Sequence, residues 1–91
     1  MFYVYVLRSL KDHQFYTRMT ADLKRRVSEH ENGRSEATRL RRPFRLMYYE
    51  AYVNEQDAQR RERYLKSGMG KRDLRRRLCE TLNTLACGAR V

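Results

Sequence analysis

The start of the chain, residues 2–7, is a run of aromatic and β-branched residues, a composition typical of a buried strand. Successive side chains of a strand point to opposite faces. The two faces would carry Tyr3, Tyr5 and Leu7 on one side and Phe2, Val4 and Val6 on the other. Residues 11–13 follow as a turn, which Asp12 favours. Because this connection is so short, residues 14–19 are predicted to return as an antiparallel strand.

A first helix is predicted to begin after Thr20, a preferred N-cap residue, and to end near residue 31, where Asn32 and Gly33 follow. Asp22 would lie in the first turn, where the helix dipole favours an acid. One face of this helix carries apolar residues at helical spacing together with two residues able to do chemistry. These are Leu23, Arg26, Val27 and His30.

The second half of the chain predicts one more strand and two more helices. Residues 44–53 read as a strand with Leu46, Tyr48 and Tyr52 on one face and Met47, Tyr49 and Ala51 on the other. Asn54 is predicted to cap a helix that runs to Lys66 and is broken by residues 67–70. A last helix from Lys71 would carry an apolar stripe of Leu74, Leu78, Leu82 and Leu85.

Together these patterns predict an α+β fold with a small three-stranded antiparallel sheet flanked by helices, in the order β-β-α-β-α-α. A chain of 91 residues fits one domain. We expect that domain to span residues 1–85 and residues 86–91 to form a frayed tail.

The charge of the chain favours a polyanionic partner. Lys and Arg total 21 against 11 acidic residues, giving a net charge of +10. Most of the basic residues are arginine, whose planar guanidinium binds phosphate in a bidentate manner. Nucleic acid is therefore the predicted partner. The competing interpretation is a basic protein without a specific partner.

The compartment is predicted to be the cytoplasm, with no membrane association. No stretch approaches the roughly 20 apolar residues of a membrane span, and the N-terminus lacks the pattern of a signal peptide. Cys79 and Cys87 have neither a metal-ligand spacing nor a CxxC pattern, so a reduced intracellular thiol pair is expected.

Glu62 is the first residue that the spacing marks as a candidate for chemistry. It shares one face of its helix with Ala58 and Leu65. A carboxylate on such a face is costly to bury unless it is paired or binds a cation. Two interpretations remain open: a Mg²⁺ ligand, because this hard cation often takes one or two protein carboxylates, or an ion pair with an arginine.

Arg26 and His30 form a second candidate pair, and Tyr5 and Tyr16 a third. An inward arginine can stabilise a phosphate in a transition state, and a nearby histidine can accept a proton. A phenol near a cation can help to position or deprotonate an attacking water. The competing interpretation pairs Arg26 with an acid, places His30 at the edge of the core, and treats the tyrosines as core residues with satisfied hydroxyls.

Basic residues in the loop of residues 33–43 and around the last helices suit contacts with phosphates that position nucleic acid without reading its sequence. A solvated charged face is the alternative. The residues predicted to contact nucleic acid are Arg18, Arg25, Arg34, Arg39, Arg41, Arg42, Lys66 and Lys71.

In this order, these segments resemble the GIY-YIG nuclease superfamily, and within it a family of small single-domain bacterial proteins. Residues 3–7 are similar to the first motif, with Tyr5 at its tyrosine, and residues 15–20 to the second, with Tyr16 at its tyrosine. The three further matching segments are residues 22–27 with His30, residues 42–46, and residues 58–68 around Glu62. The short tyrosine motifs are weak signals alone, whereas their order together with the last segment is specific.

The resemblance implies hydrolysis of a DNA phosphodiester with one divalent metal ion, Mg²⁺ or Mn²⁺. It assigns the metal to Glu62, the scissile phosphate to Arg26, and the attacking water to Tyr5 with help from His30 or Tyr16. DNA repair, or action on branched or single-stranded DNA, is the expected setting. A domain this small is also expected to draw on a protein partner for specificity.

Arg18 departs from the pattern of the superfamily, which has a glycine at this position. An arginine there either crowds the substrate channel and misplaces Tyr16, or supplies a further phosphate contact. The first outcome gives an alternative function, a non-catalytic nucleic-acid-binding module on the same scaffold. A third interpretation is a small basic protein that docks on a ribosome or a larger assembly.

Overall fold

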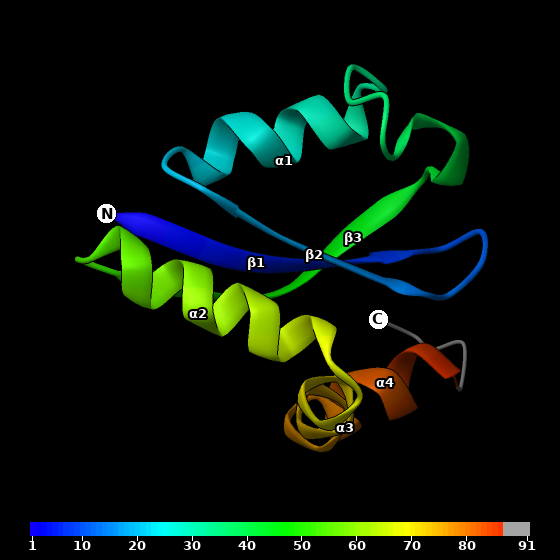
Figure 1. Cartoon of the computed structure of the whole chain (residues 1–91). Helices are drawn as coiled ribbons and strands as arrows, with labels where there is room; N and C mark the ends of the chain where they lie inside the picture. Colours follow the sequence, from blue (N-terminus) through cyan, green and yellow to red (C-terminus); the bar gives the residue numbers. More distant parts are fainter. Residues whose placement is uncertain (87–91) are drawn as a thin grey trace.

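A computed structural model describes residues 1–86 and shows a three-stranded sheet with helices on both sides (Figure 1). In chain order, its elements are β1 (Phe2–Ser9), β2 (Phe15–Thr20), α1 (Leu23–Glu31), the 3₁₀ helix η1 (Arg39–Arg41), β3 (Phe44–Tyr52), α2 (Glu55–Lys66), α3 (Gly68–Arg77) and α4 (Cys79–Ala86). The strand order is β2-β1-β3, and both pairs are antiparallel. The predicted α+β class is therefore confirmed.

The predicted tail of residues 86–91 lies outside the described residues apart from Ala86, which ends α4. Within the part of the chain that the structure describes, no helix has the length and apolar character needed to cross a membrane.

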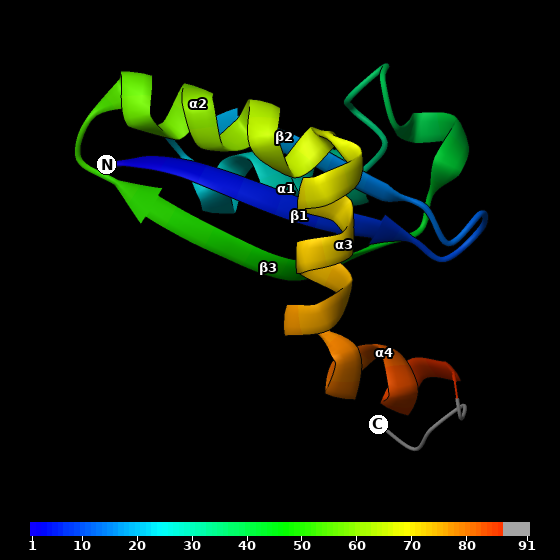
Figure 2. The same cartoon turned by 60° about the horizontal axis from the view of Figure 1, so that its bottom comes forward.

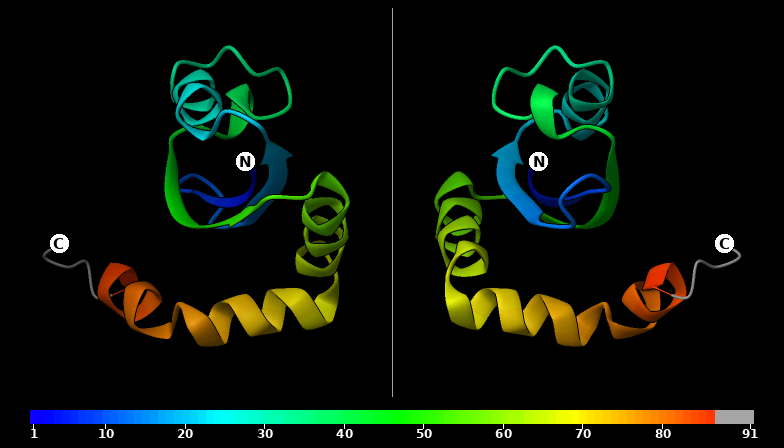
Figure 3. Two further views of the ribbon diagram at one scale, coloured as in Figure 1. Left: turned by 90° about the vertical axis from the view of Figure 1, so that its left-hand side faces the viewer. Right: turned by 90° about the vertical axis from the view of Figure 1, so that its right-hand side faces the viewer.

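The central strand β1 divides the core into two clusters, as its alternation predicted. Tyr5 and Leu7 pack with Phe44 in the layer that α1 covers. Val4 and Val6 pack on the other face of the sheet with three residues of α2 and α3, namely Ala58, Leu65 and Leu74. Figure 3 shows these layers from the side, with α1 above the sheet, α2 beside β2 and α3 below.

A β-bulge in β3 changes the face on which one predicted residue lies. Val6 is opposite Tyr48, whereas the next residue of β1 is opposite Leu46, so Met47 is an inserted residue. Leu46 consequently lies with Tyr49 on the α1 side, and Met47 packs with Tyr48 on the α2 side. The prediction that grouped Leu46 with Tyr48 was wrong, because simple alternation does not anticipate an inserted residue.

The first helix begins after Asp22 rather than after Thr20. The Asp22 Oδ1 atom accepts a hydrogen bond from the Arg25 backbone N–H at 3.1 Å, which makes Asp22 the N-cap. The Thr20 hydroxyl instead accepts from the Asp22 N–H, at 3.1 Å, in the turn that leads into the helix. The predicted cap at Asn54 is confirmed, since its side chain accepts from two backbone N–H groups of α2.

The last predicted helix is in fact two helices, and it begins earlier than Lys71. Ser67 ends α2 and also caps α3, because its hydroxyl accepts from the Gly70 N–H at 3.1 Å. A second break at Leu78 separates α3 from α4; α3 packs against the sheet through Leu74, whereas α4 lies beyond the sheet (Figure 2). The stripe of leucines still faces the core at Leu74, Leu78 and Leu82, while the side chain of Leu85 lies outside the described part.

Gly70 allows α2 and α3 to approach each other closely. A Cβ atom on Gly70 would lie 1.9 Å from the Tyr64 carbonyl oxygen. We expect Gly70→Ala to lower the free energy of unfolding by roughly 3 kcal/mol, because the two helices have to separate. Urea denaturation measures this loss.

Gly68→Ala is the matched control, since the nearest atom to its added Cβ is 3.8 Å away on Arg72. The free energy of unfolding of this variant should be unchanged or higher by up to about 1 kcal/mol, because alanine has a higher helix propensity than glycine. Equal losses in the two variants would contradict the packing role of Gly70.

Candidate active site

The layer between the sheet and α1 brings together four of the predicted catalytic residues. Tyr5 comes from β1, Tyr16 from β2, and Arg26 and His30 from α1. The Tyr5 hydroxyl lies 2.9 Å from the His30 Nε2 atom, and both residues are fully buried. The Tyr16 ring packs edge-on against the imidazole, with ring centroids 5.3 Å apart.

His30 has a second buried partner, Thr38, which the sequence did not indicate. The His30 Nδ1 atom lies 2.7 Å from the Thr38 hydroxyl oxygen, and Thr38 is also fully buried. Thr38 belongs to a polar loop without periodicity, so no local pattern predicts its burial. The result is a continuous hydrogen-bonded series from Thr38 through His30 to Tyr5.

Arg26 lies at the exposed end of this series. Its guanidinium pairs with Glu29, with Nη1 and Oε1 2.5 Å apart, and its charge acts on the nearby Tyr5 phenol. About a third of its side chain, 35%, is exposed. Glu29 is a further residue missed by the sequence analysis, although its i+3 spacing from Arg26 is a signal for such a pair.

Burial keeps Tyr5 and His30 uncharged at neutral pH. It raises the pKa of the Tyr5 phenol, and the nearby Arg26 guanidinium opposes this shift only in part. Burial also lowers the pKa of His30, and the nearby Arg26 charge acts in the same direction. A neutral phenol beside a neutral imidazole can donate its proton to Nε2 while Nδ1–H donates to Thr38.

Arg18 lies next to this cluster. It is directly opposite Tyr5 in the β1–β2 register and is exposed on the sheet face that carries Tyr16. Among the described residues, His13 is the only non-glycine residue with a positive φ, so the backbone at Arg18 does not require a glycine. The departure from the superfamily therefore adds a long cationic side chain without straining the strand.

Glu62 lies in α2, on the other side of the sheet from α1. Its side chain is 18% exposed and pairs with the Lys66 ammonium at 3.5 Å. No hydrogen bond or ion pair joins it to Tyr5 or Arg26 within residues 1–86. Glu62 is thus the one predicted catalytic residue that the structure does not bring into contact with the others.

The direction of Glu62 follows from the geometry of α2. Successive residues of a helix are about 100° apart, and Arg61 reaches Glu50 of β3. Glu62 therefore projects from the flank of α2 away from β3. Because α2 packs on β1 and β2, this flank is the one nearer to the edge strand β2.

The donor set around Glu62 suits a weakly coordinated hard cation. No group of three or more His, Cys, Asp or Glu side chains able to hold a metal occurs in the described residues. A single shielded carboxylate still fits Mg²⁺, which keeps several waters and often binds through one or two protein carboxylates plus substrate phosphates.

The residues predicted to contact nucleic acid divide into two groups. Four are engaged within the protein. Arg41 pairs with Asp12 at 2.9 Å and lowers the pKa of that carboxyl to about 2. Arg42 donates hydrogen bonds to the carbonyl oxygens of Arg39 and Glu31. Arg25 pairs with Glu29, and Lys66 pairs with Glu62. The other four are exposed, and no ion pair holds them in the part of the chain that the structure describes: Arg18, Arg34, Arg39 and Lys71.

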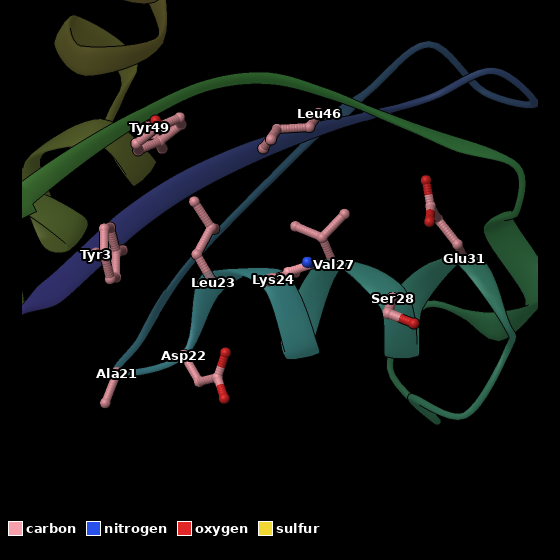
Figure 4. A pocket seen from close by; sticks show the side chains of 10 residues that line it. All are labelled: Tyr3, Ala21, Asp22, Leu23, Lys24, Val27, Ser28, Glu31, Leu46 and Tyr49. Carbon is pink, nitrogen blue, oxygen red and sulfur yellow. The ribbon is translucent and has the colours of Figure 1, made fainter.

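A groove runs along the flank of α1 that faces β3, between the helix and the strand (Figure 4). Leu23 and Val27 point from α1 toward the sheet, where Tyr3 and Tyr49 pack edge to face. The residues at its rim include Asp22, Lys24 and Glu31. Because none of the predicted site residues lines it, the groove is separate from the candidate active site.

The lowered pKa of His30 predicts how stability depends on pH. The unfolded chain takes up a proton near pH 6.5 that the folded protein accepts only at lower pH. The free energy of unfolding should therefore fall as the pH drops below about 6.5, by up to about 1.4 kcal/mol per pH unit. Urea denaturation between about pH 7 and pH 5 measures the slope.

His30→Gln should remove this part of the slope, whereas His13→Asn, at an exposed turn residue, should keep it. A wild-type stability that does not change over this range would contradict the burial of a neutral imidazole.

Comparisons with known proteins identify relatives of this chain. The family model of the GIY-YIG catalytic domain matches residues 1–78. A UPF0213 protein of Clostridium perfringens is 43% identical over 67 residues, which cover 72% of this chain and 71% of that protein. A UPF0213 protein of Pediococcus acidilactici is 40% identical over 77 residues, 81% of this chain and 78% of that protein.

A solved structure is also similar. The solution NMR structure of a UPF0213 protein from Bacillus halodurans has a TM-score of 0.51 and 38% identity, and the match covers 81% of this chain and 82% of that one. The chain therefore belongs to the GIY-YIG catalytic domain family and, within it, to the small bacterial UPF0213 proteins.

Proposed function

We propose that this protein is a metal-dependent endonuclease that hydrolyses DNA phosphodiester bonds. The observation that carries the proposal is the meeting of Tyr5, Tyr16, Arg26 and His30 in one cluster. They come from three elements and include a proton donor, a proton acceptor and a cation. Membership of a catalytic domain family supports the same reaction class.

The hydrogen-bonded series supports a role in activating water. A candidate general base must lie within hydrogen-bond reach of the proton that it accepts. In the proposed step, the Tyr5 oxygen takes a proton from water while its own proton passes to His30 Nε2, 2.9 Å away. The Thr38 hydroxyl lies at Nδ1, and when it accepts the Nδ1 proton the imidazole is in the tautomer that accepts at Nε2. The Tyr16 ring restricts the rotation of the imidazole.

Arg26 is the proposed phosphate-binding residue. Its guanidinium lies near the Tyr5 phenol and its side chain is partly exposed, so a phosphate bound there would lie near the proposed water-activating oxygen. Positive charge fixed at this point would stabilise the charge that develops on the phosphate in the transition state. Glu29 fixes the orientation of Arg26 from the other side.

Glu62 is the proposed ligand of a divalent cation, Mg²⁺ or Mn²⁺. When bound, this ion would neutralise charge on the leaving oxygen of the phosphodiester. Glu62 projects from the flank of α2 nearer to β2, and Tyr16 and Arg18 lie on β2 itself. The substrate is therefore proposed to lie along the edge strand β2.

The biological setting is also part of the proposal. We place the activity in the cytoplasm, in DNA repair or on branched or single-stranded DNA. RNA is the alternative substrate. A domain of this size is proposed to gain specificity from a protein partner.

A non-catalytic nucleic-acid-binding module is the second candidate function, and Arg18 is the observation that favours it. The side chain of Arg18 shares the sheet face with Tyr5 and lies opposite it in the register. It adds affinity for phosphate, and it also occupies space next to the proposed water-activating oxygen.

Glu62→Gln tests the proposed enzyme. With labelled DNA and Mg²⁺ or Mn²⁺, we expect its single-turnover cleavage rate to fall at least about 100-fold, with DNA binding retained, because only the metal ligand is removed. Glu55→Gln, at an exposed acid in the same helix, is the control and should cleave like the wild type. Tight binding by the wild type with no cleavage under either metal would support the binding module instead.

Arg18→Gly tests whether the extra side chain obstructs the site. We expect cleavage to become roughly tenfold faster, because small displacements of reacting groups have large effects on rate. Arg34→Gly removes the same charge from an exposed loop position and should not accelerate cleavage. An unchanged or lower rate for Arg18→Gly would show that Arg18 is harmless or useful.

A further inference from the structure

Two adjoining pockets lie on the surface of α2 and α3 and share Tyr64 as a common wall. The first is lined by Arg60, Arg61 and Asp57 together with this tyrosine. The second is lined by Arg72, Arg76 and Asp73. Four arginines thus converge on one small area that the proposed function leaves unassigned.

This area is separate from the candidate active site. The helices α2 and α3 pack on the sheet face of Val4 and Val6, whereas Tyr5 lies on the opposite face under α1 (Figure 3). On α2, the first pocket lies on the flank of Arg61, and Glu62 projects from the other flank.

The charges of the two pockets are not balanced. Asp57 pairs with Arg60 at 3.1 Å, and Asp73 pairs at 3.5 Å with Arg77, which is not among the residues that line the pockets. Within residues 1–86, no ion pair holds Arg72 or Arg76, and both are exposed. Two guanidinium groups are therefore available to an anionic ligand.

Arg61 is held rigidly at the edge of this area. Its guanidinium donates to both Glu50 oxygens, at 3.0 and 3.1 Å from Nε and at 3.0 Å from Nη2, and it lies over the Tyr64 ring at 5.0 Å. These bonds leave Nη1 unused. A cation fixed in this way loses little conformational entropy when it binds an anion.

We propose that the two pockets form a second nucleic-acid site, which binds phosphates of the sugar–phosphate backbone. Arginine forks match phosphate geometry, and the net charge of +10 favours a nucleic acid over a short acidic peptide. The nucleic-acid identity of the ligand rests on the proposed function, but binding here needs neither the metal nor cleavage. A DNA molecule that occupies this site and the candidate active site together would extend across α2.

The salt dependence of DNA binding tests this proposal. Binding of a labelled duplex is measured without divalent metal, with the full chain, over a range of NaCl concentrations. Each phosphate contact contributes about −0.9 to the slope of log affinity against log salt. Arg72→Gln/Arg76→Gln should make the slope less negative by about 1.8. Lys11→Gln/Lys24→Gln removes the same charge from exposed positions elsewhere and should leave the slope near its wild-type value.

An unchanged slope for the arginine variant, or an equal change in the lysine control, would overturn the proposal. Binding of polyglutamate is measured in parallel. If the arginine variant loses polyglutamate binding but keeps the wild-type salt slope for DNA, the pockets bind an acidic peptide, and the proposed nucleic-acid site is wrong. The binding measurement contains no metal, so it does not depend on whether the wild-type protein cleaves DNA. A less negative salt slope in the arginine variant would support the second site even if the protein has no nuclease activity.

Discussion

The buried imidazole of His30 connects three parts of the chain, and the candidate active site depends on it. One nitrogen lies against Tyr5 of the central strand and the other against Thr38 of the loop that leads to β3. Because His30 is fully buried, leaving either nitrogen without a partner costs about 1–3 kcal/mol. Helix α1 therefore cannot slide along the sheet without breaking bonds that the proposed chemistry also uses.

The sheet separates the two chemical parts of the proposed centre. The groups that handle protons and bind the phosphate lie under α1, whereas the carboxylate of Glu62 lies on α2 in the other layer. Ala58 and Leu65 turn one face of α2 into the core, Arg61 reaches Glu50 of β3, and Glu62 therefore projects from the flank away from β3. In the sheet of the described residues, β2 and β3 are both edge strands, and Glu62 projects from the flank of α2 nearer to β2. The substrate is therefore proposed to reach both layers along β2.

Local patterns predicted much of this arrangement. The alternation of β1 separated Tyr5 and Leu7 from Val4 and Val6, and helical spacing placed His30 inward. Two predictions were wrong for identifiable reasons. An inserted residue in β3 places Leu46 on the other face of the sheet. Ser67 both ends α2 and caps α3, so α3 begins before Lys71. The burial of Thr38 depends on contacts between distant segments, which no local pattern contains.

Cleavage of DNA by Tyr5→Phe tests the central claim most directly. This substitution keeps the ring in the core and removes only the hydroxyl, which is hydrogen-bonded to His30 and lies near Arg26. The account predicts a single-turnover rate at least about 100-fold below the wild type with Mg²⁺, the size typical of lost acid–base catalysis, and an unchanged affinity for DNA. A variant that cleaves as fast as the wild type would contradict it.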